Sequence, residues 1–366
     1  MDQPPRSQVR PGALPSPSAE PAADRCPTLQ DIADAVGLSR AAVSMALRGD
    51  RSIPAATRER IERAAKDLGY RPNPLVASLM SLQRRRRSAA GLRTTIAFLS
   101  CQDWRGIPSY QAMFTGARER AAEVHCVLED FKLRAPGMTP LRMRKILSTR
   151  GVHTAIVAPM PYGERTLDFD FSSMIAVGLG MSLTTPLLER VANDHYQSAI
   201  LAVEKCIALG YKRIGLIVSE SSSRRLDHRW LGGYHFALHR AGVPPLPPLS
   251  PEDVDDIPGV LPAWLAHHQP EVVISGHEII HRAIFDRIPR SVGVVLLATP
   301  TADSPWSGIH QNFHLIGRMA AERAISRLYT NNFDNLEQAY LHLIAGDWVA
   351  GRSAPGPGRL RPPAVA

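Results

Sequence analysis

Basic and small side chains recur at helical spacing just after Ser39. In a helix that starts there, Val43 and Leu47 share one face and would pack inward. The opposite face then carries Arg40, Ala41, Ser44, Met45 and Arg48. These side-chain types suit the edges of base pairs in the major groove, because a guanidinium can donate two hydrogen bonds to guanine and a methyl group can contact thymine. The pattern therefore predicts a helix that reads double-stranded DNA.

The elements that must position this helix are predicted on either side of it. Thr28 can cap a preceding helix that Gly37 ends, and a following helix covers about residues 55–68 and stops at Gly69. Three short helices with a tight glycine turn between the first two form a helix-turn-helix arrangement. We therefore assign residues 28–72 to an all-α DNA-binding headpiece. Residues 1–27 are rich in Pro, Ala and Ser and are predicted to form a disordered tail.

The remainder of the chain alternates strand-like apolar runs with helical segments from Thr94 onward. Such alternation indicates parallel sheets flanked by helices, with ligands bound at the carboxyl ends of the strands. We therefore expect an α/β domain of two lobes facing a cleft over residues 94–353. Residues 73–93 are predicted to form a hinge helix and a basic linker that contains the arginine run 84–87, and residues 354–366 a disordered C-terminal tail.

The composition points to an acidic partner. The formal net charge is +9, the isoelectric point is about 9.7, and the basic residues concentrate between Arg40 and Arg93. The four cysteines lack the short paired spacings of zinc ligands, and we predict no metal and no cofactor. No apolar run is long enough to span a membrane, and no secretion signal begins the chain, which indicates a cytoplasmic protein.

The strings 28–39 (TLQDIADAVGLS), 57–61 and 68–73 closely resemble the headpiece of the LacI/GalR family. Weaker similarity to the sensor core of that family extends through Asn193-Asp194 to residues 351–353. The resemblance implies a homodimeric regulator, most commonly a repressor, that binds a pseudo-palindromic operator. Its periplasmic-binding-protein-like domain would bind a small-molecule effector that controls the affinity for DNA. By analogy, the first lobe is residues 94–210 plus 309–333, and the second is 211–308 plus 334–353.

The resemblance also extends the DNA-binding set. Arg40 and Ala41 match the two positions at which the family principally reads bases, whereas Met45 stands where an arginine is usual. Hydroxyls that would contact phosphates, and that can also cap helices, belong to Thr28, Ser39, Ser44 and Thr57. In the hinge, Asn73 begins the predicted helix, and Leu79 matches the leucine that wedges into the minor groove at the operator centre.

An effector site between the lobes is implied in the same way. Asp194 matches a pocket carboxylate of the family, while Trp230 replaces an arginine and has Arg229 beside it. His277 and Glu278 occupy the usual Asn-Asp position. Aromatic side chains expected either to face the cleft or to pack in the core are Trp104, Tyr110, Trp230 and Trp306. The effector stays open between a sugar or related metabolite and a protein co-regulator.

Two other classes of function are disfavoured. His195 and His310, like His277 and Glu278, lie in no catalytic motif, so we do not expect an enzyme. A solute-binding protein without a gene-regulatory role is the alternative interpretation, and both the headpiece and the missing signal peptide argue against it. Inducer or corepressor control, repression or activation, and a dimer or a tetramer remain open alternatives.

Overall fold

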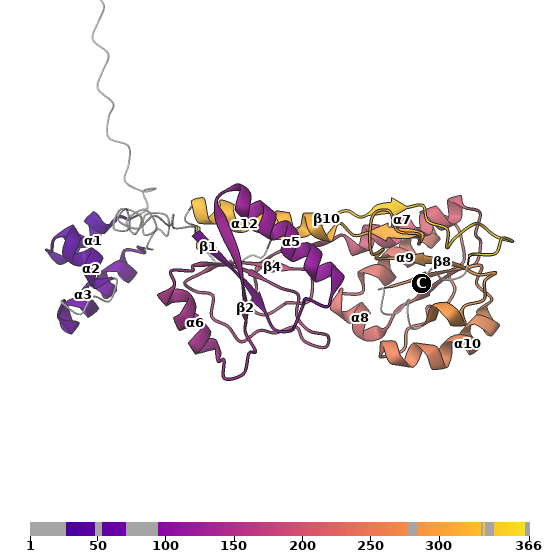
Figure 1. The fold of residues 1–366 in the computed structure, drawn as a ribbon, viewed down its shortest axis with the longest axis horizontal. Helices are drawn as coiled ribbons and strands as arrows, with labels where there is room; N and C mark the ends of the chain where they lie inside the picture. Colours follow the sequence, from indigo (N-terminus) through magenta and orange to yellow (C-terminus); the bar gives the residue numbers. More distant parts are fainter. Residues whose placement is uncertain are drawn as a thin grey trace, which may run out of the picture. The chain divides into compact units, whose positions relative to one another are not determined.

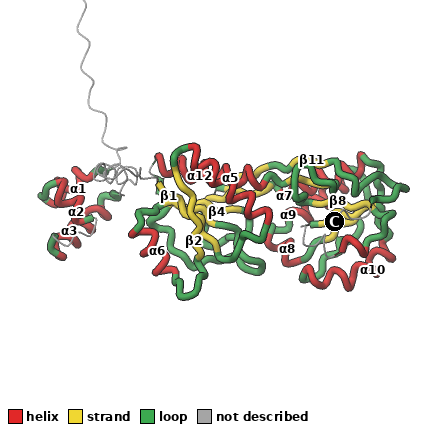
Figure 2. The backbone as a smooth tube through the Cα atoms, in the orientation of Figure 1, coloured by secondary structure: helices red, strands yellow, loops and turns green. Residues whose placement is uncertain are grey.

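The computed structural model of the protein describes residues 27–47, 53–70, 94–276, 284–330, 332–333 and 340–362. Contacts divide the chain into two units, one that ends at Asn73 and one that begins at Pro74. The first is helical (Figure 1), and the second contains two sheets with helices around them (Figure 2). No helix within the described ranges is long and apolar enough to cross a membrane.

The first unit contains three short helices, α1 (Leu29–Val36), α2 (Arg40–Ala46) and α3 (Ala55–Asp67). Its core is built from small and branched apolar side chains that are at most 5% exposed: Ile32, Ala33, Val43, Ala46, Ile61 and Ala65. Helix α2 therefore turns Val43 and Ala46 inward, whereas Leu47, which the spacing predicts to be inward, is only partly buried. Burial of these side chains fixes α2 against both of its neighbours.

The ends of these helices follow local sequence signals. Thr28 and Asp31 form a capping box, in which the Thr28 hydroxyl accepts from the Asp31 N–H at 3.4 Å and the Asp31 carboxylate accepts from the Thr28 N–H at 2.5 Å. Gly37 ends α1 and Gly69 follows α3, with φ values of 65° and 67° that glycine adopts without steric cost. The Tyr70 N–H then donates back into the last turn of α3 at 2.8 Å.

The first lobe of the second unit is built on a six-stranded parallel sheet. Its strands, in their order across the sheet, are β10 (Leu341–Ile344), β5 (Glu189–Asn193), β4 (Ile175–Leu179), β3 (Thr154–Val157), β1 (Thr94–Ser100) and β2 (Cys126–Lys132). Strand β10 comes from near the C-terminus and pairs with β5 at the edge of the sheet. This lobe is therefore completed only by a distant part of the chain.

Alternate residues of these strands face two helical layers. Ile96 and Phe98 pack against α5 (Pro108–Glu123) and α12 (Phe313–Tyr329), whereas Leu99 packs toward α6 (Pro140–Thr149) on the opposite face (Figure 1). Helices α5 and α12 approach closely where glycines lie at their crossing. A Cβ atom on Gly317 would lie 1.8 Å from the Met113 carbonyl oxygen, so the contact requires glycine.

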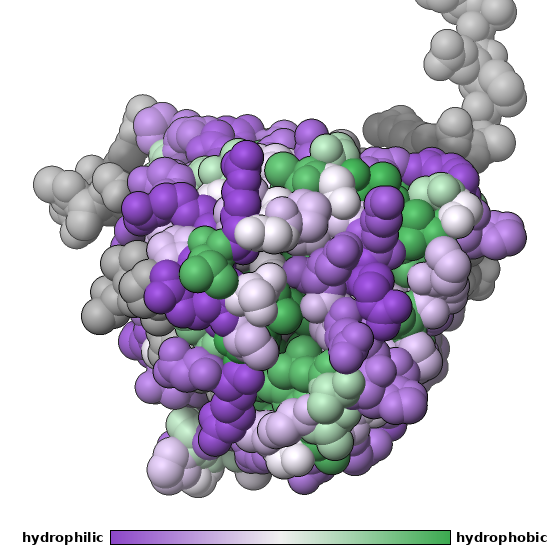
Figure 3. All heavy atoms as spheres, turned by 90° about the vertical axis from the view of Figure 1, so that its right-hand side faces the viewer, coloured by the Kyte–Doolittle hydropathy of each residue, from purple (hydrophilic) through white to green (hydrophobic). Residues whose placement is uncertain are grey.

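The second lobe has a five-stranded sheet of order β11 (Asp347–Val349), β9 (Gly308–His310), β8 (Gly293–Leu296), β7 (Val272–Ser275) and β6 (Ile214–Ile217), in which β11 alone is antiparallel to its neighbour. Its helices are α7 (His195–Ala208), α8 (Glu220–Arg225), α9 (Arg229–Arg240) and α10 (Ile257–His268), with short 3-10 turns at Val254–Asp256 and Phe285–Arg287. Seen from its outer end, this lobe carries hydrophilic side chains that separate its apolar patches (Figure 3).

The chain passes between the lobes after β5, after β9 and after β10. The crossing segments are joined to one another, because the Asn193 amide donates to the Gln311 carbonyl and the Asn312 amide donates to Asp347 at 2.8 Å. The lobe boundaries expected by analogy are wrong in two places. Helix α7 packs in the core of the second lobe, and β10 belongs to the sheet of the first, because sheet pairing rather than sequence order decides each element's lobe.

Residues 354–362 differ from the predicted disordered tail. Ala354 is buried, and the Arg361 guanidinium, only 2% exposed as a residue, donates to the carbonyls of Phe285 and Ile288 at 2.9 and 2.6 Å. The same guanidinium lies 3.7 Å from the centre of the Phe285 ring. These polar and cation–π contacts hold a segment that composition alone marks as disordered. Residues 363–366 of the predicted tail lie outside the described residues.

Candidate nucleic-acid interface and interlobe site

Helix α2 presents a small polar surface at its N-terminal end. The Ser39 hydroxyl accepts from the Ala42 N–H at 3.2 Å and so caps the helix. Arg40 and Ala41, in the first turn, are exposed, while Ser44 and Met45 on the same helix are half-buried. Arg40 and Ala41 are thus the most accessible of the four side chains predicted to contact base edges.

Arg40 lies close enough to Tyr70 for its charge to act on the phenol. Partial burial raises the pKa of the Tyr70 phenol, and the positive charge of Arg40 opposes that rise. The phenol therefore remains neutral near pH 7 and does not neutralise the guanidinium. A charged arginine is what bidentate hydrogen bonding to guanine needs.

The remaining DNA-binding predictions fall in several places. Thr28 and Ser39 both cap helices, so a phosphate contact there would share a hydroxyl that is already hydrogen-bonded. Thr57 is half-buried in the first turn of α3, which Pro54 precedes without a side-chain cap. The other predicted residues, Arg48, Asn73, Leu79 and the arginine run 84–87, lie outside the described residues.

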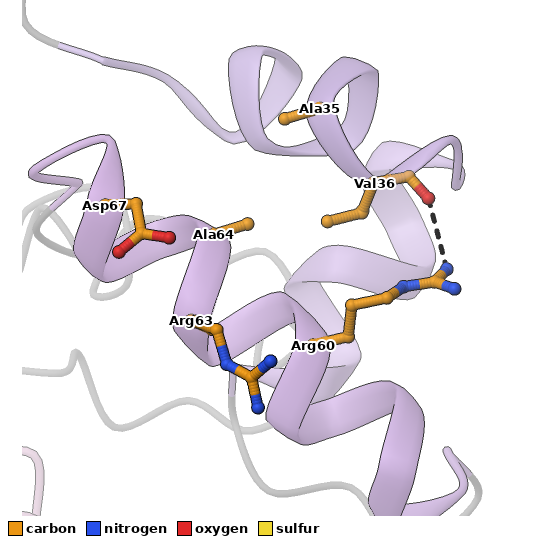
Figure 4. Close-up of a pocket in the computed structure, with 6 residues that line it drawn as sticks. All are labelled: Ala35, Val36, Arg60, Arg63, Ala64 and Asp67. Atoms are coloured by element: carbon orange, nitrogen blue, oxygen red, sulfur yellow. Dashed lines mark hydrogen bonds between the residues drawn. The ribbon is translucent and has the colours of Figure 1, made fainter.

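A hydrogen bond joins α3 to the C-terminal end of α1. The Arg60 guanidinium on α3 donates to the Val36 carbonyl at the end of α1 at 3.1 Å (Figure 4). The last carbonyls of a helix lack partners within that helix, and a cation near them is also favoured by the helix dipole. A hollow next to this bond is lined by Ala35, Val36, Arg60, Arg63, Ala64 and Asp67, all from α1 and α3 (Figure 4).

The two lobes of the second unit meet at Arg225 on α8. Its guanidinium donates to three oxygens of the first lobe, the carbonyls of Met160 (2.6 Å) and Pro161 (3.1 Å) and the hydroxyl of Tyr110 (3.0 Å). It also lies 4.8 Å from the centre of the Tyr162 ring. Burial raises the pKa of the Tyr110 phenol, and the nearby charge of Arg225 opposes that rise. Tyr110 is thus placed where the lobes touch.

The three tryptophans predicted for the effector site pack within the lobes. Trp104, 5% exposed, lies against the rings of Phe98 and Phe114 and donates to Asp130 at 3.2 Å. Trp230, 2% exposed, belongs to the core of the second lobe and meets the His195 ring edge-on at 5.3 Å. Trp306 lies 4.5 Å from the Phe285 ring, again edge-on. In the structure described here their flat faces serve packing, which is the alternative that the sequence left open for each of them.

The other predicted effector residues have different surroundings. Asp194 caps α7, because its carboxylate accepts from the Gln197 N–H at 3.0 Å. Arg229 is the first residue of α9, and its Nε is buried with no hydrogen-bond partner among the described residues. His277 and Glu278 lie outside the described residues.

Four arginines lie at the lobe interface, and we call them the interlobe arginines: Arg165, Arg190, Arg225 and Arg229. Sequence reasoning placed Arg229 at the effector site but missed the other three. Arg165, in the loop between β3 and β4, donates across the interface to Asp227 at 2.7 Å. Arg190 lies on β5, half-buried between the buried residues Glu189 and Val191. Burial lowers the pKa of Arg190; the charge of Asp227 opposes this, and the charges of Arg165 and Arg229 add to it.

The turn that carries Asp227 and Arg229 is conformationally unusual. Asp227 and the following His228 have φ values of 51° and 55°, which non-glycine residues adopt only at a cost on the order of 1 kcal/mol each. The Ser223 hydroxyl and the His228 ring, 3.0 Å apart, help to hold this turn. Each buried guanidinium Nε left without an acceptor costs a further 1–3 kcal/mol or so. Such costs concentrate at binding sites.

Comparisons with known proteins agree with this architecture. Residues 28–73 match the family of bacterial regulatory proteins of the lacI type, and residues 203–353 match a periplasmic binding protein-like domain. The transcriptional regulator GntR of Escherichia coli is 27% identical over 223 residues, which cover 60% of this chain and 62% of GntR. The match thus spans less than two thirds of that relative. The regulator PtxS of Pseudomonas plecoglossicida is 45% identical over 53 residues, or 14% of this chain and 16% of PtxS.

Solved structures show the same fold. A CelR–cellobiose complex has a TM-score of 0.54 at 20% identity and covers 90% of this chain and 100% of its own. A lac repressor dimer bound to operator and the anti-inducer ONPF has a TM-score of 0.53 at 18% identity, with 90% and 99% covered. The predicted fold class, a helix-turn-helix headpiece with a two-lobed periplasmic-binding-protein-like domain, is confirmed.

Proposed function

Because this chain belongs to the LacI family of bacterial regulatory proteins, we propose that it is a transcriptional regulator that binds a pseudo-palindromic operator as a homodimer. A small-molecule effector bound between the lobes would control its affinity for DNA. It would act in the cytoplasm, most simply as a repressor, and without catalysis of its own. The observation that carries this proposal is the α2 surface, on which exposed Arg40 and Ala41 follow a capping serine.

The relatives support both halves of the proposal. One similar structure holds operator DNA together with an anti-inducer, and another holds cellobiose. In this chain, the interlobe arginines and Tyr110 lie where the two lobes touch, so a ligand there would contact both lobes. A ligand that contacts both lobes favours one of their arrangements over another, which is the requirement for control of a distant site.

Selection of bound sequences from random duplexes tests the DNA half. A dimer with one reading helix per subunit should enrich an inverted repeat with half-sites about one helical turn apart. Direct repeats, or no enrichment, would overturn the proposal.

Point variants then test the assignment of α2. Arg40→Ala should weaken binding to the selected operator by about 1–3 kcal/mol and scarcely change binding to random DNA. Arg63→Ala is the matched control, because Arg63 is an exposed arginine on α3 that lines the hollow between α1 and α3 (Figure 4). Equal losses on both DNAs for Arg40→Ala would contradict a base-reading role.

A further inference from the structure

Among the described residues, Arg165 is the one interlobe arginine that forms an ion pair, and its partner is Asp227. Arg165 and Arg190 come from the first lobe, and Arg225 and Arg229 from the second. The charges of Arg165, Arg229 and Asp227 all act on Arg190, so these four groups are near neighbours. Of the nearby acids, Glu220 and Glu252 pair with Arg224, and Glu164 pairs with Arg134. Asp227 pairs with Arg165, and its charge also acts on Arg190.

Three of these cations also hold unused donors. The Nε atoms of Arg165, Arg190 and Arg229 are buried, and none has a hydrogen-bond partner among the described residues. The remaining hydrogen bonds of Arg165 and Arg190 are made to backbone carbonyls and to Asp227. Buried donors normally find acceptors, so three that converge on one boundary mark a place where an acceptor is expected. Because all three belong to guanidinium groups, a negatively charged oxygen satisfies both the donors and the charge.

We propose that the effector is an anion, a small molecule whose carboxylate or phosphate group binds Arg190 from the first lobe and Arg229 from the second. Arg165 adds charge next to them and stays tied to Asp227. This inference rests on the proposed function, because it names the chemical class that the effector site takes. A neutral sugar offers hydroxyl oxygens but no charge, so the site should discriminate strongly in favour of the anion.

The test is calorimetric titration of the full chain, free of DNA, with D-gluconate, glucose 6-phosphate, inorganic phosphate and glucose at matched ionic strength in chloride. At least one of the three anions should bind ten times more tightly than glucose. Gluconate alone would identify a carboxylate site, and the phosphates alone a phosphate site. If no anion binds more tightly than glucose, the proposal is overturned.

Substitutions at the proposed ligands test where the anion binds. Arg190→Gln and Arg229→Gln should each weaken binding of the successful anion at least tenfold, and Arg229→Lys, which keeps the charge but loses the Nε donor, should weaken it several-fold. Arg240→Gln is the matched control, because Arg240 lies on the same helix α9, is exposed and pairs with Glu204; it should change binding by less than twofold. Thermal unfolding confirms that each variant is folded. Anion binding that survives both Arg190→Gln and Arg229→Gln would place the site elsewhere.

The anion titration and the operator selection that tests the proposed function can fail independently of each other. Anion binding without operator selection would leave this inference standing and remove the regulatory role. Operator selection together with preferential binding of glucose would do the reverse.

Discussion

Arg225 offers the sharpest test of how the two lobes are held together. Arg225→Gln removes a guanidinium that donates to Met160, Pro161 and Tyr110 of the opposite lobe. Hydrogen bonds to charged groups are each worth about 1.5–3 kcal/mol. Since Arg225 is only half-buried, solvent screening reduces their sum, and we expect the lobe–lobe interface to lose about 2–4 kcal/mol. At 1.4 kcal/mol per factor of ten, opening of the lobes should become about 30 to 700 times more favourable.

Hydrogen–deuterium exchange read by mass spectrometry measures this opening. Peptides that cover residues 158–165 and 222–229 should exchange faster in Arg225→Gln, because their amides become accessible when the lobes separate. Tyr110→Phe removes one acceptor and should produce a smaller change in the same peptides.

Arg224 provides the matched control in sequence and charge. It is adjacent to Arg225 but pairs with Glu220 and Glu252 within its own lobe. Arg224→Gln should therefore leave exchange at residues 158–165 unchanged. If Arg225→Gln accelerates exchange there no more than Arg224→Gln does, then Arg225 is not what holds the lobes together.

Three further variants probe stability. Glu189→Gln should lower the melting temperature far more than Glu204→Gln, because Glu189 is 1% exposed and accepts from Arg323, Arg327 and His342, and breaking a buried charge network costs about 3–5 kcal/mol. Burial alone would raise the pKa of Glu189, but these partners hold the pKa below its usual value. The stabilisation of the fold by ionised Glu189 is therefore present above about pH 4.3 and is lost in more acidic solution, where the melting temperatures of the unsubstituted protein and of Glu189→Gln should converge. Gly317→Ala should destabilise by about 1–3 kcal/mol through overlap with the Met113 carbonyl, whereas Gly259→Ala, in open space on α10, should stabilise slightly; equal effects would contradict the close crossing. Arg60→Ala should speed hydrogen–deuterium exchange of the α1 amides, because it removes a hydrogen bond worth about 1 kcal/mol, and Arg63→Ala should leave that exchange unchanged.

The parts of this protein that could be predicted from sequence are those in which local signals decide the structure. Thr28, Gly37, Ser39 and Gly69 start or stop the headpiece helices through bonds to residues no more than a few positions away. The exposure of Arg40 and Ala41 follows from the 3.6-residue period, which misplaced Leu47, because Ala46 is the fully buried residue. Local chemistry therefore sufficed for the start and the first turn of α2.

Features that depend on distant contacts were not predictable in the same way. Arg165, Arg190 and Arg225 are 25 to 60 positions apart, and no short motif contains them. The tryptophans had the right chemistry for stacking on a ligand, but their burial depends on partners such as Phe114 and Phe285. The assignment of β10 and α7 to their lobes depends on strand pairing and on core packing. The packing of Arg361 depends on its hydrogen bond to Phe285, a distant residue in the sequence.

The return of the chain to both sheets has a consequence for protein synthesis. Strand β10 closes the first sheet and β11 closes the second, and both lie beyond residue 340. A nascent chain that has left the ribosome only as far as α12 therefore exposes β5 as an unpaired edge, which is a template for aggregation. Both sheets therefore stay incomplete until the last part of the chain is made, and a truncation before residue 341 removes a strand from each of them. Translation past residue 344 is thus a precondition for the first sheet, and translation past residue 349 for the second.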